Sequence, residues 1–311
     1  MPHLLVIGAN GVLGTTATKF FLSKGFNVSA FVRDKNKAAD LENSGATILT
    51  GDITDRASLQ NIFSTVDAVL TAAHGMLGKG KNSSKNVDEI AHKDLIDYAK
   101  QAGVKHFVYT SVFAASSNHI IDFFRAKHLI EEYLIKSGLT YTILKLPAFI
   151  EWHAYNLSGK GIVEKGKTTI FGSGTHAENF IAVKDVVVAL DKIVLNEEYY
   201  NRSIPLAGPE NISKNEVAVL FGNALNIQPR VSHVPTTALK ALSFVIRPFH
   251  PGIARVIKLA VWNERSDQTM NTDQSIAQFG LKPTHITEFI ELVINQKKYF
   301  FCLQQRIYNK Q

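Results

Sequence analysis

Apolar runs and amphipathic stretches alternate along residues 3–206 of the chain. Nearly unbroken apolar runs predict buried strands at residues 4–7, 27–32, 46–50, 66–71, 105–110, 140–146 and 203–206. Amphipathic stretches between them predict helices at residues 15–22, 37–43, 87–102, 122–136 and 184–195, and one more around Leu59 and Phe63. This alternation indicates a doubly wound α/β fold, in which right-handed crossovers join parallel strands.

The alternation loosens after Pro147, where only residues 168–171 predict a further short strand. Ser213, followed three residues later by Glu216, matches a capping box and predicts a helix that ends near Asn226. Further helices are predicted at residues 236–246, 253–262, 272–279 and 284–295. Within the earlier helix at residues 87–102, the spacing places Ile90, Leu95, Ile96 and Ala99 on one face. No repeat, low-complexity segment or linker marks a domain boundary.

A glycine-rich turn, Gly8-Ala9-Asn10-Gly11-Val12-Leu13-Gly14, joins the first strand to the first helix. Gly8 permits a tight turn, Gly11 lets a pyrophosphate approach the backbone, and Gly14 lets the helix pack closely on the strand. The free N–H groups and positive dipole end of the helix would then face the phosphates. The spacing G-x-x-G-x-x-G differs by one residue from G-x-G-x-x-G, and glycines also serve ordinary turns. The position between strand and helix nevertheless favours a nucleotide site.

The composition of the 311-residue chain, 45% hydrophobic with a single cysteine, predicts a large core and a reducing compartment. Strand-forming residues begin at His3, leaving no room for a signal peptide, and no apolar stretch is long enough to span a bilayer. We therefore expect a soluble, cytoplasmic protein.

The net charge of +7 is concentrated near the C-terminus. Residues 229–262 contain Arg230, Lys240, Arg247, Arg255 and Lys258 and no acid, and residues 296–311 are also basic without an acid. Such a surface could attract membrane phosphates, nucleic acid or an acidic partner. Because the basic residues are dispersed among apolar ones, we expect a solvated face rather than membrane or nucleic-acid binding.

The second predicted strand ends at Arg33, where an NAD site usually has an acidic residue that binds the ribose. A guanidinium there can bind the 2′-phosphate of NADP with two charge-assisted hydrogen bonds, and Lys35 and Lys37 add positive charge. We therefore favour NADP (NADPH) over NAD. The alternative is that Arg33 is a surface residue and Asp34 accepts from the ribose.

Several motifs together resemble the NmrA-like family of atypical short-chain dehydrogenases/reductases. They are the glycine turn, Arg33, Gly51-Asp52, Thr110-Ser111-Val112, Lys127-x-x-x-Glu131, the segment 141–149, Leu206-Ala207-Gly208-Pro209 and Phe279-Gly280. The resemblance covers roughly residues 1–295. It implies an NAD(P)-binding Rossmann domain at residues 1–150, with its mainly parallel sheet completed within residues 180–207. A smaller C-terminal domain at residues 151–295 would cover the substrate cleft, and residues 296–311 would form a basic aromatic tail.

The resemblance also implies which residues bind the cofactor. The pyrophosphate would lie on Gly8, Asn10, Gly11, Val12, Leu13 and Gly14, and the adenine between Asp52 and Ile53. The backbone of Ala72 and Ala73 would line the ribose, Lys127 would bind the nicotinamide ribose, and Pro147, Ala148 and Phe149 would close over the nicotinamide. Asp52 could instead be a turn residue, and Lys127 a solvated helix lysine.

Reductases that use a tyrosine acid place it four residues before the active-site lysine, a position that Phe123 occupies here. Phenylalanine has no proton to give, so reduction of a carbonyl to an alcohol is not expected. A bound cofactor could still pass hydride to a conjugated acceptor. Lys127, Ser111 and His153 are the candidate catalytic residues, although His153 is equally a packing residue. Phe113, Phe149, Trp152, Tyr155 and Phe180 could form a wall for a flat substrate or belong to the core.

These patterns favour an NADPH-dependent reductase of a quinone-like or other conjugated acceptor, acting as a monomer or homodimer on a small, flat molecule. The family also contains cofactor-binding redox sensors, co-regulators and assembly factors without known turnover, and this non-catalytic role is the alternative. No spacing of His, Cys or carboxylates predicts a metal site, and no nucleophilic serine motif is present.

Overall fold

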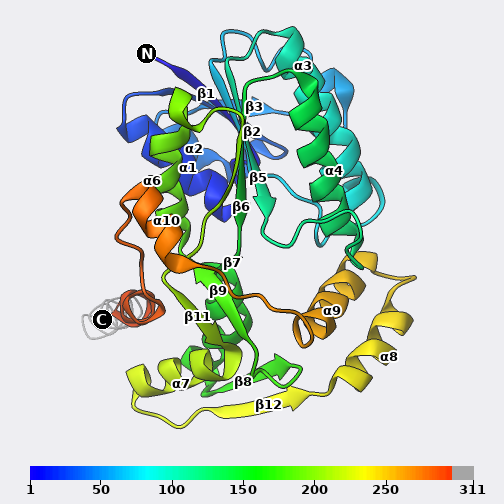
Figure 1. The fold of residues 1–311 in the computed structure, drawn as a ribbon, viewed down its shortest axis with the longest axis vertical. Helices are drawn as coiled ribbons and strands as arrows, with labels where there is room; N and C mark the ends of the chain where they lie inside the picture. Colours follow the sequence, from blue (N-terminus) through cyan, green and yellow to red (C-terminus); the bar gives the residue numbers. More distant parts are fainter. Residues whose placement is uncertain (296–311) are drawn as a thin grey trace, which may run out of the picture. The chain divides into compact units, whose positions relative to one another are not determined.

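The computed structural model describes residues 1–295, so the predicted tail at residues 296–311, with Cys302, lies outside the described residues. Contacts group the chain into two units (Figure 1). The first contains residues 1–146, 183–206 and 241–259, and the second contains residues 147–182, 207–240 and those from 260 onward. Residues 241–259, which the sequence assigns to the C-terminal domain, group with the first unit.

The first unit is built on a seven-stranded sheet in the order β10-β6-β5-β4-β1-β2-β3, in which every neighbouring pair is parallel. Its strands are β1 (His3–Ile7), β2 (Asn27–Val32), β3 (Thr47–Thr50), β4 (Ala68–Thr71), β5 (His106–Val112), β6 (Tyr141–Leu146) and β10 (Arg202–Pro205). The order reverses between β1 and β4, as in Rossmann sheets. The predicted doubly wound α/β fold is confirmed.

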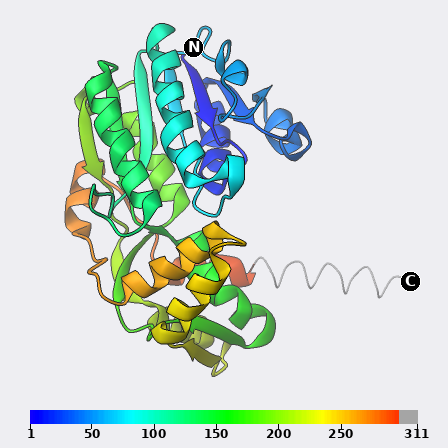
Figure 2. The same cartoon turned by 90° about the vertical axis from the view of Figure 1, so that its right-hand side faces the viewer.

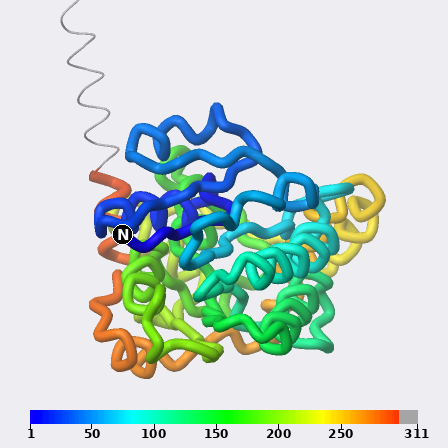
Figure 3. The backbone as a smooth tube through the Cα atoms, turned by 90° about the horizontal axis from the view of Figure 1, so that it is seen from above, coloured from blue at the N-terminus to red at the C-terminus, as the bar shows by residue number. Residues whose placement is uncertain are grey.

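Helices cover both faces of this sheet (Figures 1 and 3). They are α1 (Val12–Ser23), α2 (Ala39–Asn43), α3 (His92–Gln101), α4 (Asp122–Ser137) and α6 (Val183–Ile193), with short 3₁₀ turns at Lys35–Lys37, Arg56–Leu59, Gly80–Asn82 and Glu197–Tyr199. α1 lies beside α6, and α3 lies beside α4. Buried apolar side chains of β1, β4, β5 and β6 pack against α3 and α4 and form the main core.

Two predicted helices differ from the structure. The predicted helix at residues 87–102 is a π-helical segment, η4 (Lys85–Ala91), followed by α3. The wider π turn rotates Ile90 outward, where it is 46% exposed, while Leu95 and Ile96 stay buried. The predicted helix around Leu59 and Phe63 is only the 3₁₀ turn Arg56–Leu59, which the Asp55 side chain caps.

The second unit contains two small sheets and its own core. A three-stranded sheet has the order β11-β9-β7, and β8 pairs in parallel with β12. The strands are β7 (Ala148–Phe149), β8 (Lys167–Phe171), β9 (Ala177–Ile181), β11 (Glu210–Ser213) and β12 (Arg230–Val234). The helices are the π-helical η5 (Ile150–Gly159), α5 (Lys160–Lys165), α7 (Lys214–Leu225), α10 (Thr272–Phe279) and residues 286–295. The predicted capping box of α7 is confirmed, with Ser213 and Glu216 bonded reciprocally.

Helices α8 (Thr236–Ile246) and α9 (Pro251–Asn263) follow one another through a short turn that contains Pro248 (Figures 1 and 2). The structure confirms the predicted break between them, because proline cannot continue a helix. Across residues 1–295, no helix has the length and apolar content that a membrane crossing requires.

Candidate functional site

The glycine turn leaves the N-terminus of α1 open. Gly8 has φ +81°, and a Cβ there would lie 2.8 Å from the backbone N of Ala73. A Cβ on Gly14 would lie 2.3 Å from the carbonyl oxygen of Gly8, so both positions admit only glycine. Gly11 is the N-cap, and no side chain of the described chain caps the helix. The exposed first turn of α1 can therefore accept an anion.

This turn lies where the strand order reverses. The N–H of Ala72, directly after β4, donates to the carbonyl of Ile7 at 2.9 Å, so the carboxyl ends of β1 and β4 are held side by side. In open parallel sheets, ligands bind outside the carboxyl ends of the strands at this reversal. The predicted pyrophosphate turn and the predicted ribose-lining residues Ala72 and Ala73 thus meet at one place.

Positive charge from the end of β2 and from the loop after β4 gathers near Asp52, which follows β3. Arg33 is exposed and its Nη1 donates to Asn82 Oδ1 at 3.1 Å, while Lys81 Nζ lies 3.7 Å from Asp52. Burial raises the pKa of Asp52, but hydrogen bonds from Thr54 and the charges of Lys81 and Arg33 outweigh it and hold the pKa below its usual value. Lys81 and Asn82 were missed from sequence, because they lie far along the chain in a glycine- and lysine-rich loop.

Asp52 and Asp34 both bond to nearby backbone. Asp52 accepts from the N–H and hydroxyl of Thr54 at 3.1 and 2.9 Å, so it does form the turn considered as its alternative role. Ile53, predicted to flank the adenine, is buried beside it. Asp34 accepts from the N–H of Asn36 at 3.1 Å, so one of its carboxylate oxygens already caps a 3₁₀ turn. Arg33 caps no turn, so the N–H groups that it does not use toward Asn82 are available to a ligand at this edge of the sheet.

Lys127 is buried on α4 at the carboxyl end of β5. Only 3% of it is exposed, so its alternative role as a solvated helix lysine is wrong. Its Nζ donates to the carbonyl of Thr110 at 3.1 Å and lies 4.0 Å from Asp88 Oδ1. The ammonium also lies 4.8 Å from the ring centre of Tyr109 and 5.8 Å from that of Phe123. Phe123 thus borders Lys127 but offers it no hydroxyl.

Asp88 is a further functional candidate that sequence reasoning missed. It is fully buried on η4 and accepts from the N–H of Gly75 at 3.0 and 3.2 Å. Burial raises the pKa of Asp88 to about 6, against the opposing charge of Lys127. Burial likewise lowers the pKa of Lys127, against the charges of Asp88 and Glu131. Asp88, His92 and Leu95 follow one helical stripe, which was the available signal for a buried acid.

Two further buried polar groups lie beside this pair. His92 Nδ1 contacts the carbonyl of Val87 at 2.6 Å, and burial lowers the pKa of His92 to about 3, so the ring is neutral and Nδ1–H donates. The His92 ring lies 5.4 Å from that of Tyr109. Among the described residues, neither His92 Nε2 nor the Tyr109 hydroxyl has a hydrogen-bond partner. Each of these two buried atoms can still form a hydrogen bond in the surroundings of Lys127.

Ser111 is held by a different set of charges. Its buried hydroxyl donates to Glu131, and Lys145 Nζ lies 3.0 Å from the same carboxylate. Ser111 and Lys145 are register partners on β5 and β6, so Glu131 ties α4 to both strands. The proton-relay role of Ser111 remains a prediction, and its hydroxyl hydrogen is already bonded.

Within the second unit, β7 consists of Ala148 and Phe149; Pro147 directly precedes it and η5 directly follows it. The N–H of Phe149 donates to His153 Nδ1 at 3.1 Å, which leaves the proton of the neutral ring on Nε2. Burial lowers the pKa of His153, and the charge of Glu178 opposes this. His153 is therefore a neutral donor through Nε2 near pH 7.

The aromatic residues considered for a substrate wall have different surroundings. Phe180 is almost fully buried in the core of the second unit, and Tyr155 packs against Phe221, with ring centres 6.2 Å apart. Trp152 is exposed. For Phe180 and Tyr155 the core alternative is thus correct. Among residues 1–295, no cluster of His, Cys and carboxylates has the make-up of a metal site.

A parallel sheet in this order, with a glycine turn before an open helix at its reversal, defines the class of Rossmann-type nucleotide-binding folds. The resemblance predicted from the motifs is confirmed across nearly the whole chain. The protein belongs to the NmrA-like family, whose model matches residues 2–290.

Relatives and solved structures with similar chains carry different activities. Photosystem II assembly factor Ycf39 of Guillardia theta is 29% identical over 289 residues, covering 91% of this chain and 90% of the relative. The chloroplastic divinyl chlorophyllide a 8-vinyl-reductase of Arabidopsis thaliana is 29% identical over 266 residues, covering 78% of this chain and 62% of the relative. A solved NADPH-dependent quinone oxidoreductase from Escherichia coli, in complex with NADPH, has TM-score 0.75 at 20% identity, covering 93% of this chain and 99% of that chain.

Proposed function

We propose that the protein is an NADPH-dependent reductase that transfers hydride to a quinone-like or other conjugated acceptor. The observation that carries the proposal is the buried Lys127, which lies at the same strand ends as the open glycine turn. Arg33 and Lys81 support NADP over NAD, because they supply positive charge where the 2′-phosphate would bind.

The residues present fit this cofactor. The uncapped first turn of α1 would hold the pyrophosphate, and Lys127 would bind hydroxyls of the nicotinamide ribose. NADPH, when bound, supplies the hydride. Asp88 holds Lys127 in place and lies with it away from water, so the ammonium keeps one orientation. Phe123 provides no acid, so a quinone or enone would take its proton from water; the neutral ring of His153 can donate a hydrogen bond through Nε2–H but has no proton to release.

An acceptor panel tests this proposal. Purified protein with NADPH would be given quinones, enones and saturated ketones, and loss of nicotinamide absorbance would be followed. We expect turnover with conjugated acceptors and none with saturated ketones, since Phe123 has no proton to give. Lys127→Ala should lower turnover strongly, while Lys192→Ala, an exposed lysine on α6, should leave it unchanged. Turnover that survives Lys127→Ala would reject the role of this lysine.

A second candidate function is binding of NADP(H) without turnover, in an assembly factor or redox sensor. Two observations favour it: Phe123 in place of an acid, and the similarity to an assembly factor over 91% of this chain. Tight NADPH binding without oxidation by any acceptor in the panel would favour this function over the reductase.

A further inference from the structure

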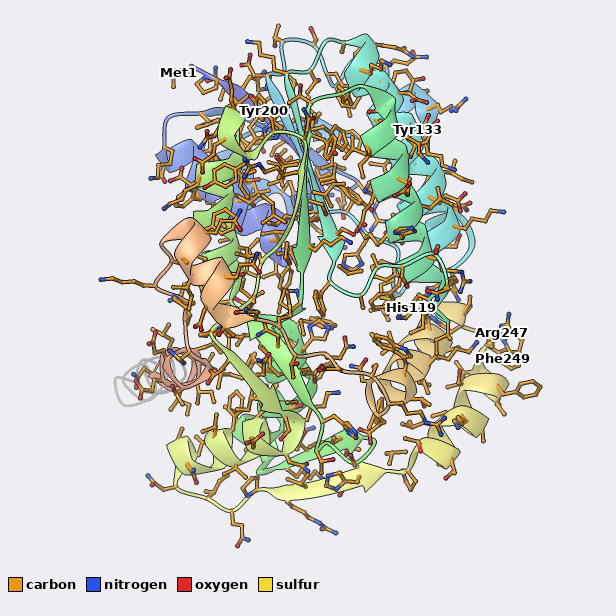
Figure 4. All side chains as sticks on the ribbon, in the orientation of Figure 1. Met1, His119, Tyr133, Tyr200, Arg247 and Phe249 are labelled. Carbon is orange, nitrogen blue, oxygen red and sulfur yellow. The ribbon has the colours of Figure 1, made fainter. Side chains whose placement is uncertain are left out.

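The last turn of α8 and the turn that leads to α9 expose large apolar side chains. Phe244 is 81% exposed, Phe249 is 77% exposed, and Val245 is also exposed; these three residues form what we call the apolar tip. Figure 4 shows Phe249 and Arg247 extending away from the ribbon at this turn. Apolar side chains that protrude in this way do not line a groove. Exposed groups of apolar residues commonly mark a binding surface.

The apolar tip is held by a buried arginine. Arg255 on α9 is almost fully buried, and its Nε and Nη2 donate to the two carboxylate oxygens of Asp122 at 2.6 and 2.8 Å. Its Nη1 donates to the carbonyl of Met76 at 2.6 Å, and the hydroxyl of Ser243 donates to the carbonyl of Ala254 at 3.1 Å. The bonds of Arg255 attach residues 241–259 to the rest of the sheet unit, and the bond of Ser243 joins α8 to α9, so the fold itself presents the tip.

A basic hollow of about 300 Å³ lies directly beside the tip. Its lining includes Arg125, Arg247 and Lys258, together with the exposed Ile120. Asp122 also lines it but is neutralised by Arg255. Neither Arg247 nor Lys258 forms an ion pair within residues 1–295, and the sequence has no acid between residues 229 and 262. The hollow therefore offers free positive charge next to exposed apolar surface.

We propose that this face docks on the surface of a membrane that contains anionic phospholipids. Phe244, Val245 and Phe249 would enter the boundary between headgroups and acyl chains, while Arg247 and Lys258 would contact lipid phosphates. Protruding apolar residues beside unpaired cations suit this surface better than the groove of a protein partner. From sequence, dispersed basic residues predict a solvated face; in the structure Arg247 and Lys258 are exposed, and Phe244 and Phe249 are exposed near them.

Vesicle sedimentation with the full-length protein tests the proposal. Vesicles of phosphatidylcholine alone would be compared with vesicles containing phosphatidylglycerol. We expect binding to the anionic vesicles that weakens with added salt, and little binding to the neutral ones. Phe244→Ser with Phe249→Ser should lower the partition coefficient by roughly tenfold or more. Arg247→Gln with Lys258→Gln should lower it by roughly tenfold and reduce its dependence on salt.

Matched controls separate docking from misfolding. Val219→Ser removes an exposed apolar residue of α7, and Lys192→Gln removes an exposed lysine of α6; both variants should bind vesicles as the unchanged protein does. Thermal unfolding and NADPH titration of each variant report folding independently of the membrane. Absence of binding to either vesicle, or binding unchanged by both double variants, would overturn the proposal. A shift from dimer to monomer in the phenylalanine variant, without vesicle binding, would instead identify a contact between two copies of the chain.

Discussion

Replacing Asp88 with asparagine tests the buried pair on which the position of Lys127 depends. Asparagine has nearly the same shape and keeps an oxygen that can accept from the N–H of Gly75, but it carries no charge. Lys127 would then keep its bond to the carbonyl of Thr110 and lose its only nearby counter-charge on η4. The substitution therefore isolates the electrostatic part of the contact.

The size of the effect follows from burial. Asp88 is fully buried and Lys127 is 3% exposed, and removal of one partner of a buried pair costs about 3–5 kcal/mol. We expect the lower end, about 3 kcal/mol at pH 7.5, because Lys127 keeps its bond to the carbonyl of Thr110 and the nearby charge of Glu131.

The pH dependence follows from the pKa of Asp88, which rises on folding from 3.8 to about 6. A raised pKa favours the folded state at low pH, and this contribution is lost as the pH rises through about 6. Between pH 7.5 and pH 5 the unchanged protein gains about 1.4 kcal/mol of stability as Asp88 takes up its proton, a gain that asparagine cannot make, so the cost of the substitution should grow by that amount.

Urea unfolding followed by circular dichroism measures the loss of unfolding free energy caused by Asp88→Asn at pH 7.5 and at pH 5. Asp40→Asn is the matched control, because its partner Lys19 is an exposed residue and that surface pair should contribute less than about 1 kcal/mol. Addition of Lys127→Met to Asp88→Asn should recover much of the loss. A cost within experimental error of the control, or a cost equal at both pH values, would refute the buried ion pair.

Four further substitutions test other parts of the fold and site. Arg33→Ala should weaken NADPH binding by roughly tenfold to a hundredfold and NADH binding much less; equal losses in calorimetric titrations would remove the preference for NADP. Gly14→Ala should lower the melting temperature, because its Cβ would meet the carbonyl of Gly8 at 2.3 Å, whereas Gly11→Ala should keep the fold and weaken NADPH binding; equal melting temperatures would contradict this. Burial lowers the pKa of His106 from 6.5 to about 4, so the protein should lose about 3 kcal/mol of stability from this group as the pH falls through that range. Urea unfolding at a series of pH values should show no such acid-dependent loss of stability in His106→Gln. A loss as large as in the unchanged protein would contradict its assignment to His106.

The sheet of the first unit could be predicted because its strands are long, apolar and separated by clear helical periods. The strand predicted at residues 27–32 matches β2 residue for residue. The glycine turn lies between β1 and α1, as the patterns on either side of it predict. Ile90 was misplaced because a π-helical turn changes the phase of the helix without changing its hydrophobic pattern.

Other features depend on contacts that no local pattern records. β9 pairs with β11 and β7 through residues distant in sequence, so these short strands were missed. Asp88 was overlooked because sequence alone does not show that this acid on an apolar stripe lies beside Lys127. Four of the five basic residues of 229–262 are exposed, as the predicted solvated face requires, whereas Arg255 is buried. Sequence alone does not show that Phe244 and Phe249 are exposed on either side of Arg247.

Single-turnover reduction of a quinone by NADPH bound to the protein tests the central proposal most directly. NADPH would be compared with NADPH carrying deuterium at the carbon that donates the hydride, and oxidation of the nicotinamide would be followed after rapid mixing. Hydride transfer at this site predicts oxidation faster than in solution and slower with the deuterated cofactor. Tight binding of NADPH with no oxidation above the uncatalysed rate would contradict it.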